Sequence, residues 1–240
     1  MLNNYVNKIT CGDCYKLIKE IPDKSVDLIV TDPPYDIEVD HGSGAFGTEK
    51  RLHYAQFAPF SHGIKEEILT EFVRVLKKIN LYIFCSKKQI PMLIDFFVTK
   101  RNCYYDLISW HKTNPVPACG NKYMNDTEYC LFFRQKGVPL YGTSESKKTY
   151  YLTPINIKDK RTFNHSTIKP IEIIKNFIIN STEENDIVLD PFCGSGTTCA
   201  ACQELGRQYI GFEISEKWCK VANDRLNKID TSGQTCMFLR

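Results

Sequence analysis

The sequence contains no apolar run of about eighteen residues, the length that a membrane-spanning helix needs, so we expect no membrane span. Its formal net charge is only +3, so contact with nucleic acid would need a local basic patch rather than charge spread over the whole molecule. The first residues lack the charged and apolar regions of a secretory signal, which predicts a cytoplasmic location. A length of 240 residues suits one sizeable core, and we expect a single domain over residues 1–240.

Among the eleven cysteines, two pairs have two residues between their members, namely Cys11 with Cys14 and Cys199 with Cys202. Without a secretory signal, reduced thiols are the simplest interpretation of the eleven. A zinc site would need cysteines on tight turns, but Cys199 and Cys202 lie in a segment that predicts a helix. We therefore expect no metal site.

The most informative stretch is Thr-Asp-Pro-Pro-Tyr at residues 31–35, which follows the apolar run 26–30. The apolar run predicts a buried strand. Two consecutive prolines cannot continue a sheet, so the chain must leave it in a rigid turn. That turn places a carboxylate and an aromatic ring at the carboxyl end of a strand, where open α/β sheets bind their ligands.

The turn has the groups that could activate an exocyclic amine of a nucleobase. Such an amine is a weak nucleophile, because its lone pair is delocalised into the ring. Asp32 and the carbonyl of Pro33 could each accept one of its hydrogens, and the base could stack on Tyr35. The same residues could instead form only a strand ending, with Asp32 as a local cap and Tyr35 as packing.

Apolar periodicity elsewhere predicts an α/β fold with a mostly parallel, twisted sheet and helices on both faces. Two of the strands, residues 104–110 and 128–134, are expected to pair as an antiparallel addition to that sheet. The other expected strands cover residues 5–10, 26–30, 81–85, 187–190 and 209–213, and the expected helices cover residues 15–21, 63–78, 88–100, 171–181, 197–205 and 216–229.

Two segments lack this periodicity and mix basic with aromatic residues, namely 36–61 and 135–165. A long irregular segment inside a compact domain is typical of a lid or binding loop, so we interpret residues 36–61 as a mobile loop that meets phosphate. Basic residues among aromatics in 135–165 favour a nucleic-acid face. Either segment could instead be a solvated surface loop. The basic candidates are Lys50, Arg51, Lys147, Lys148, Lys158, Lys160 and Arg161.

A second informative stretch, residues 187–198, predicts a strand, a glycine turn and the start of a helix. Gly194 and Gly196 would let a ligand approach the backbone, and Glu213 at the end of the next strand could accept hydrogen bonds from both hydroxyls of a ribose. The third glycine of the dinucleotide fingerprint and the Gly-Lys-Thr of a phosphate loop are absent, which favours a nucleoside without phosphates. Asp13, at another strand-to-helix turn, could contact such a ligand or merely cap the helix.

Taken together, these motifs resemble those of the amino-group DNA methyltransferases that use S-adenosylmethionine (SAM). Their order along the chain resembles the circularly permuted β group of that family, and the resemblance covers nearly the whole chain. It implies a Rossmann-like class I methyltransferase fold. The matching stretches are residues 12–13, 26–35, 110–112, 128–129, His165 with Lys169 and Pro170, and residues 190–198.

The resemblance also implies roles for single residues. Glu213 would bind the ribose of SAM and Asp13 its adenine, while His165 and Lys169 would lie near its methionine end. Residues 36–61 would form a DNA-facing loop, and 135–165 a short target-recognition segment. The implied catalytic residues are Asp32, Pro33, Pro34 and Tyr35, and the implied cofactor-binding residues are Asp13, Asp32, His165, Lys169, Asp190, Phe192, Gly194, Ser195, Gly196, Thr197, Glu213 and Ile214.

The chain departs from the family pattern at two positions. Asp36 stands where the family usually has asparagine, and Ser166 replaces the proline of the family's His-Pro-x-x-Lys-Pro motif. The second change predicts a less rigid loop before the helix that starts near residue 171. The recognition segment is also short, which implies a short or degenerate target sequence or help from a second subunit.

The activity that the resemblance implies is a site-specific adenine DNA methyltransferase, which transfers a methyl group to the N6 amino group of a flipped adenine in double-stranded DNA. Methylation at carbon 5 of cytosine would need a cysteine nucleophile, and the chain has no Pro-Cys dipeptide. Methylation at N4 of cytosine is an alternative, although the family's cytosine members more often carry serine in place of Asp32. A non-catalytic DNA-binding partner subunit is another. A homodimer and a cognate restriction endonuclease are candidate partners.

Overall fold

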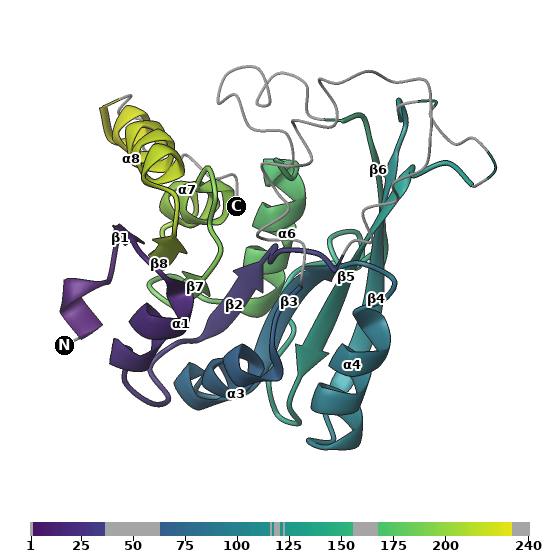
Figure 1. The fold of residues 1–240 in the computed structure, drawn as a ribbon, viewed down its shortest axis with the longest axis horizontal. Helices are drawn as coiled ribbons and strands as arrows, with labels where there is room; N and C mark the ends of the chain where they lie inside the picture. The colour runs from purple at the N-terminus through teal and green to yellow at the C-terminus, as the bar shows by residue number, and fades with distance from the viewer. Residues whose placement is uncertain are drawn as a thin grey trace.

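The computed structural model describes residues 2–36, 63–115, 117, 121, 123–155 and 168–231. Within them the strands form an eight-stranded sheet in the order β1-β8-β7-β2-β3-β5-β4-β6 (Figure 1). The strands are β1 (Lys8–Cys11), β2 (Leu28–Thr31), β3 (Asn80–Cys85), β4 (Tyr104–Lys112), β5 (Thr127–Arg134), β6 (Tyr150–Thr153), β7 (Ile187–Asp190) and β8 (Gln208–Glu213).

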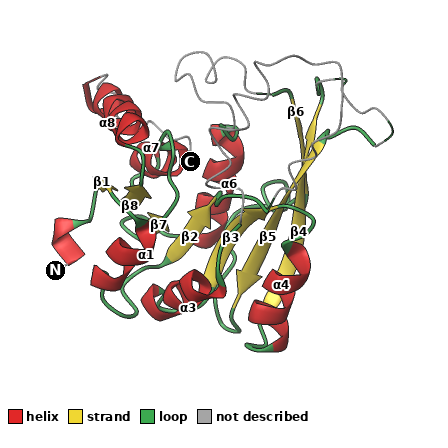
Figure 2. Ribbon diagram, viewed as in Figure 1, coloured by secondary structure: helices red, strands yellow, loops and turns green. Residues whose placement is uncertain are grey.

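Helices cover both faces of this sheet, as Figure 2 shows. Residues of α1, α3 and α4 pack into one apolar cluster with one face, and residues of α6, α7 and α8 pack into a second cluster with the other. The helices are α1 (Cys14–Leu17), α3 (Glu66–Val75), α4 (Ile90–Ile94), α6 (Ile171–Ser181), α7 (Thr197–Glu204) and α8 (Glu216–Thr231), with short 3-10 segments η1 (Leu2–Asn4) and η2 (Ile18–Glu20) and a π-helical segment η4 (Asp95–Thr99).

The predicted α/β architecture and the antiparallel pairing of β4 with β5 are confirmed. β1, β8, β7, β2 and β3 pair in parallel, β5 is antiparallel to both of its neighbours, and β6 is parallel to β4. Of the described strands, β5 alone is therefore reversed. The carboxyl ends of β2, β3, β4 and β6 consequently face the same edge of the sheet.

Three strands extend past the carboxyl end of β3 and form a wall at that edge. Cys85, the last residue of β3, pairs with Tyr129, which in turn pairs with Ser109. β4 then continues to Lys112, and β6 pairs with this extension. We call residues 109–112, 127–129 and 150–153 the β4–β6 wall. The indole nitrogen of Trp110 on β4 donates to Thr153 Oγ1 on β6 at 2.7 Å and links these two strands.

Several predicted elements differ from the observed ones. β6 lies inside the segment 135–165, for which no strand was expected, because it is a four-residue, half-exposed edge strand in a polar stretch. The expected strand 5–10 begins only at Lys8, after the 3-10 segment η1. The expected helix 88–100 becomes α4 followed by the π-helical segment η4.

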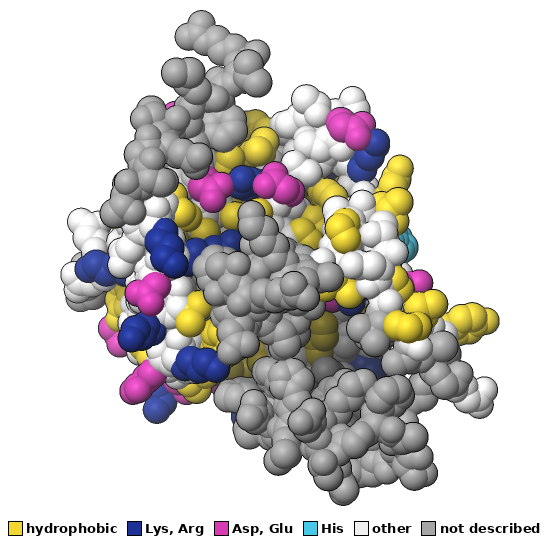
Figure 3. Space-filling view, turned by 90° about the horizontal axis from the view of Figure 1, so that it is seen from above, with side chains coloured by type: hydrophobic (Ala, Val, Ile, Leu, Met, Phe, Trp, Pro, Cys, Tyr) yellow, Lys and Arg dark blue, Asp and Glu magenta, His cyan; other side chains and the backbone are white. Residues whose placement is uncertain are grey.

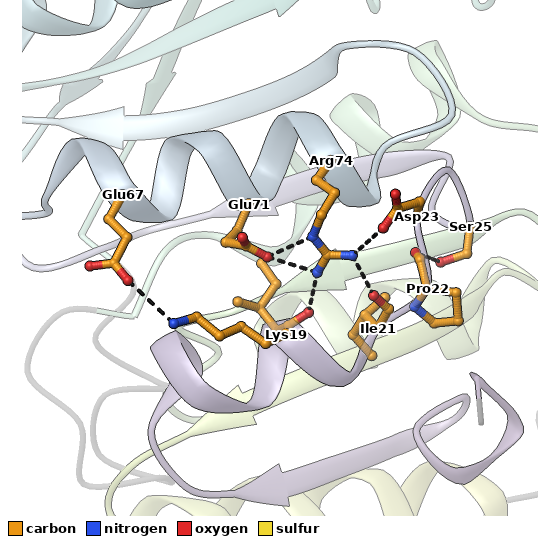
Figure 4. A network of polar contacts seen from close by, with 9 residues as sticks. Lys19, Ile21, Pro22, Asp23, Ser25, Glu67, Glu71 and Arg74 are labelled. Carbon is orange, nitrogen blue, oxygen red and sulfur yellow. Dashed lines mark hydrogen bonds and ion pairs between the residues drawn. The ribbon is translucent and has the colours of Figure 1, made fainter.

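The expected helix 15–21 is split into α1 and the 3-10 segment η2, and its end is held by an arginine of α3 (Figure 4). Arg74 donates to the carbonyl oxygens of Ile18 and Ile21, each at 2.8 Å. It also pairs with Asp23 at 2.6 Å and Glu71 at 2.7 Å. The carbonyls that a helix end leaves without partners are thus satisfied from a neighbouring helix, which fixes the connection into β2.

Candidate active site

The Asp-Pro-Pro-Tyr turn leaves the sheet at the carboxyl end of β2, between the ends of β3 and β7. The carbonyl of Pro34 accepts a hydrogen bond from Gln89 Nε2 at 3.2 Å, which anchors the turn to the start of α4. The described residues form no hydrogen bond to the carbonyl of Pro33. Its role as an acceptor for an amine hydrogen stays a prediction.

Asp32 is held in this turn by a buried lysine. The ammonium of Lys169 forms an ion pair with Asp32 Oδ2 and a second one with Glu128 Oε2 at 3.1 Å. Burial raises the pKa of Asp32, and the positive charge of Lys169 opposes that rise. The side chain of Asp32 keeps 27% of its surface exposed, so the carboxylate is both paired and open to a ligand.

Tyr35 lies on the same side of the crevice as this ion pair. The Lys169 ammonium is 5.5 Å from the centre of the Tyr35 ring. The Tyr35 hydroxyl is buried and forms no well-directed hydrogen bond with the described residues. Burial and the nearby charge of Asp32 raise its pKa well above the usual value, so the hydroxyl is neutral and lies beside the Asp32 carboxylate.

Asp190 joins this turn to the glycine turn. Its Oδ1 accepts hydrogen bonds from Thr31 Oγ1 at 2.9 Å and from the amide of Phe192 at 3.2 Å. Burial raises the pKa of Asp190 to about 7, although hydrogen bonds from Thr198, Thr31 and the Phe192 amide oppose the rise. Asp190 therefore connects the ends of β2 and β7 from a nearly fully buried position.

The glycine turn after β7 wraps around the carboxylate of Glu213 at the end of β8. Gly194 and Gly196 have φ values of 51° and 75°, which favour glycine, and α7 begins directly after them. The amide of Gly194 donates to Glu213 Oε2 at 2.9 Å, and the amide of Ser215 donates to Oε1 at 2.8 Å. Each carboxylate oxygen can accept one more hydrogen bond, so Glu213 fits a pair of neighbouring hydroxyls.

Asp13 caps α1 next to this carboxylate. Its Oδ1 accepts the amide of Tyr15 at 3.0 Å, so the capping interpretation of Asp13 is confirmed. The amide of Gly12 donates to the Glu213 carbonyl at 2.8 Å, which brings the ends of β1 and β8 together. Asp13 and Glu213 therefore flank the same edge, and contact between Asp13 and an adenine stays a prediction.

The remaining predicted cofactor residues divide by exposure. Ser195 and Thr197 are buried, and Thr197 Oγ1 accepts from Arg225 at 3.0 Å, so these two side chains support the turn from inside. Ile214 follows Glu213 and is 54% exposed, so an apolar side chain that would suit a purine ring lies beside this carboxylate. Phe192 lies in the turn itself and packs partly against the core.

Cys199 and Cys202 lie in α7, as predicted, and both are fully buried. In the described part of the chain, no group of three or more His, Cys, Asp or Glu side chains could hold a metal ion. Nor is any helix among the residues described long and apolar enough to cross a membrane.

Several predicted residues cannot be compared with the structure. His165 and the basic residues Lys50, Arg51, Lys158, Lys160 and Arg161 lie outside the described residues, as does the segment 36–61 after Asp36. Lys147 and Lys148 are described and directly precede β6. Lys148 pairs there with Glu145 at 2.5 Å, and Lys147 lines a small cavity between β4 and α6.

Two charged residues of the site had no predicted role. Glu128 at the start of β5 reaches Lys169, and Lys112 at the end of β4 pairs with Glu128 Oε1 at 2.8 Å. Burial alone would raise the pKa of Glu128, but Lys169 and Lys112 outweigh it and lower that pKa to about 2. The signal in the sequence was a charge beside an otherwise apolar strand, yet only the register of β4 against β5 brings these two together.

The surface around the site is not uniform. Seen from above the sheet edge, Lys, Arg, Asp and Glu side chains stand mostly on the side of β1 and α8, and hydrophobic side chains gather on the side of β4–β6 (Figure 3). On β4 and β6, Tyr105, Leu107, Tyr150 and Leu152 are each more than 40% exposed. The two sides of the crevice therefore suit different kinds of contact.

Comparison with known proteins agrees with this geometry. Residues 26–224 match the DNA methylase family of N6 and N4 methyltransferases. The type II methyltransferase M.HinfI of Haemophilus influenzae is 31% identical over 95% of this chain and 70% of its own length. The type II methyltransferase M.HpaI of Haemophilus parainfluenzae is 28% identical over 92% of this chain and 74% of its own length.

Solved structures show the same fold. The complex of M1.HpyAVI with SAM has a TM-score of 0.68 and 27% identity, and covers 92% of this chain and 98% of that one. The cytosine-N4-specific PvuII DNA methyltransferase also has a TM-score of 0.68, over 93% of this chain and 89% of that one, at 15% identity, and so shares only the fold. The chain therefore belongs to the DNA methylase family and is a SAM-dependent DNA methyltransferase.

Proposed function

We propose that the chain methylates the N6 amino group of adenine in double-stranded DNA. The observation that carries this proposal is the pair of acceptors at the end of β2, the Asp32 carboxylate and the Pro33 carbonyl, beside Tyr35 and next to the pocket of Glu213. Two acceptors match the two hydrogens of an exocyclic amine. Aspartate at position 32, where cytosine members of the family more often carry serine, favours adenine.

The residues of the pocket fit SAM. Glu213 would accept its ribose hydroxyls, Asp13 its adenine amine, and the glycine turn would pass along its edge, with no phosphate to bind. Lys169 and, outside the described residues, His165 are proposed to lie near its methionine end. When bound, SAM supplies a methyl group already activated by the positive sulfur.

The protein's contribution is positioning. Hydrogen bonds to Asp32 and Pro33 would hold the amine hydrogens so that the nitrogen lone pair faces the methyl carbon. Transfer would form the nitrogen–carbon bond while the carbon–sulfur bond breaks with its electrons left on sulfur, and one amine proton would pass to Asp32 and on to water. The adenine must first leave the duplex, at a cost of roughly a few kcal/mol, and Tyr35 offers a surface for it.

DNA itself is proposed to bind beside this crevice. The loop 36–61 with Lys50 and Arg51, and the segment 135–165 with Lys147, Lys148, Lys158, Lys160 and Arg161, would supply phosphate contacts and target recognition. A single domain over residues 1–240 and a cytoplasmic location are parts of the same proposal.

Two partners are also proposed. A homodimer is supported by the exposed hydrophobic side chains on β4 and β6, and sedimentation of the full chain with and without DNA would test it. A cognate restriction endonuclease is supported by the type II relatives, and an endonuclease blocked by this methylation in extracts of the source cell would show it.

Incubation of the chain with unmethylated genomic DNA and labelled SAM, followed by mass spectrometry of the nucleosides, tests the central proposal. We expect N6-methyladenine, and Asp32→Ala should reduce its formation by about 10²–10⁴-fold while SAM binding survives. N4-methylcytosine instead would overturn the choice of base. Binding of SAM and DNA without transfer would overturn catalysis and favour the partner-subunit alternative.

A further inference from the structure

Four side chains of alternating charge run from the β4–β6 wall to the catalytic turn. Lys112 Nζ lies 2.8 Å from Glu128 Oε1, Glu128 Oε2 lies 3.1 Å from Lys169 Nζ, and Lys169 Nζ pairs with Asp32 Oδ2. They come from β4, β5, the segment before α6 and the turn after β2. The charges sum to zero, so the chain of ion pairs is balanced.

Water is largely excluded from this chain of ion pairs. The side chains of Lys112, Glu128 and Lys169 are 13%, 21% and 7% exposed, so their attraction is much less screened than at a free surface. The Lys169 ammonium also lies 4.9 Å from the centre of the Phe84 ring and 5.5 Å from that of Tyr35. Two carboxylates and two rings therefore fix one ammonium in place.

This arrangement determines how Asp32 meets its substrate. Lys169 pairs with Oδ2, and the Tyr35 hydroxyl lies close to the same carboxylate without a well-directed hydrogen bond. Oδ1 is therefore the oxygen that Lys169 leaves to an amine hydrogen. Without Glu128, Asp32 would be the only carboxylate partner of the ammonium among the described residues, and the ammonium would attract it more strongly. Without Lys112, one oxygen of Glu128 would be left inside the wall without a partner.

We propose that Glu128 and Lys112 are positioning residues that hold the Lys169 ammonium against Asp32, so that Asp32 presents one ionised oxygen to the target amine. This inference rests on the proposed function. It gives Lys169 a partner in the catalytic turn in addition to its proposed place near the cofactor's methionine end. It also gives the β4–β6 wall a part in the chemistry.

The electrostatics of the neighbours support this inference. Burial raises the pKa of Asp32, Lys169 lowers it and Glu128 raises it, so Glu128 offsets part of the effect of Lys169. The other titratable groups that face Asp32 are Tyr35 in the same turn, Cys85 on β3, Cys130 on β5 and Asp190 on β7. Burial raises the pKa of each of these four, so near neutral pH the first three are uncharged.

Single-turnover methylation of DNA by the full chain, with SAM already bound, tests the inference between about pH 5 and 9. Loss of rate at low pH reports protonation of Asp32. Lys169→Met should move this acidic limb to higher pH, because a positive charge is lost. Glu128→Gln should move it to lower pH, and each variant should slow the step by up to roughly 10²-fold through misplacement of the acceptor. Partial loss of structure would not be expected to move the acidic limbs of these two variants in opposite directions.

Further variants separate position from folding. Lys169→Arg keeps the positive charge and should keep the acidic limb of the pH–rate profile where the wild type has it. The double variant Lys169→Met/Glu128→Gln should return the limb toward the wild-type position, since one charge of each sign is gone. Lys112→Met should slow the step less than Glu128→Gln. Lys175→Met is the matched control, because Lys175 on α6 pairs with Glu204 at 2.7 Å and should leave the profile unchanged.

Two results would overturn the inference. In the first, the acidic limb of the pH–rate profile does not move in Lys169→Met and Glu128→Gln, or it moves in the same direction in both variants. The other is a loss of SAM affinity of more than about tenfold in Lys169→Met with an unchanged limb, which would return Lys169 to the cofactor. If Lys169→Met does not fold, the direction of the shift in Glu128→Gln decides alone. Failure of the proposed function would appear differently, as absence of N6-methyladenine with the wild-type chain.

Discussion

The nucleoside end of the crevice is held by backbone amides, whereas the catalytic end is held by side-chain charges. Glu213 accepts hydrogen bonds from the amides of Gly194 and Ser215, and the first of these bonds joins residues only 19 positions apart. Asp32 is paired with Lys169, which is 137 positions away. The first end needs only the local unit of β7, the glycine turn, α7 and β8. The second needs the order of the sheet to be complete.

This contrast suggests a division of labour. Backbone amides cannot change their charge, so affinity for SAM should depend on pH through Glu213, the carboxylate that they hold and whose pKa burial raises. Lysines and carboxylates can be tuned by their neighbours, so the catalytic end should control turnover and its dependence on pH. Asp190 stands between the two ends, since it takes Thr31 from β2 and the Phe192 amide from the glycine turn.

The largest effect that would sharpen this contrast is the response of stability to pH at Asp190. Its pKa is raised to about 7 in the folded chain, against about 4 for an exposed aspartate. The folded state therefore holds this proton more tightly, and the resulting stabilisation is complete below about pH 4 and lost as the pH rises through about 7. The free energy of unfolding should fall over this range, by at most about 4 kcal/mol from this residue.

Asp190→Asn gives the matched comparison. Asparagine keeps an oxygen for Thr31 and the Phe192 amide but has no proton to lose in this range, so its unfolding free energy should vary less with pH. Denaturant titrations of both proteins between about pH 5 and 8 measure the difference in slope. Equal slopes of unfolding free energy against pH for the two proteins would mean that Asp190 is ionised over the whole range. The residue that connects the two ends would then carry a constant negative charge.

The same contrast explains which features were predictable from the sequence. The glycine turn, Glu213 and the Asp-Pro-Pro-Tyr turn are local patterns, in which each residue has a backbone reason for its place. Glu128 and Lys112 lie in stretches that match the family, but neither has a local reason for its place, because their contact depends on how β4 pairs with β5 and on where Lys169 lies before α6. The register between two paired strands cannot be predicted from the sequence of either strand alone.

Element boundaries follow the same rule. α6 was predicted with its observed bounds, since its apolar stripe and the proline before it are local. η2 ends where Arg74 of α3 takes its carbonyls, and that contact joins residues 53 and 56 positions apart. β6 forms because the edge of β4 is available for pairing. A four-residue segment with polar flanks has no apolar pattern from which this strand could be predicted.

A smaller effect should come from the glycine turn. An alanine Cβ at Gly196, where φ is +75°, would lie 3.0 Å from Ala222 Cβ and 3.3 Å from Ile9 Cδ1. Gly206 has a similar φ of +70° with nothing within 4 Å, so Gly206→Ala measures the backbone strain alone, about 1 kcal/mol. Gly196→Ala should cost about 1–3 kcal/mol more. Equal unfolding free energies for the two variants would mean that α8 yields, and that this end is less rigid than the contacts indicate.

The smallest effect, and the one that tests the division of labour most directly, is at Glu213. Glu213→Gln replaces one acceptor by an NH₂ group that faces a backbone amide, so it weakens the turn and removes one acceptor for a ribose hydroxyl. The dissociation constant for SAM, measured by calorimetry without DNA, should rise about 10–100-fold, as loss of a hydrogen bond to a charged group predicts. Turnover at saturating SAM should stay near that of the wild type, and Glu216→Gln, an exposed acid at the start of α8, should change neither. A large fall in turnover instead would show that the two ends of the crevice are coupled, and that the backbone-held end also positions the methyl group.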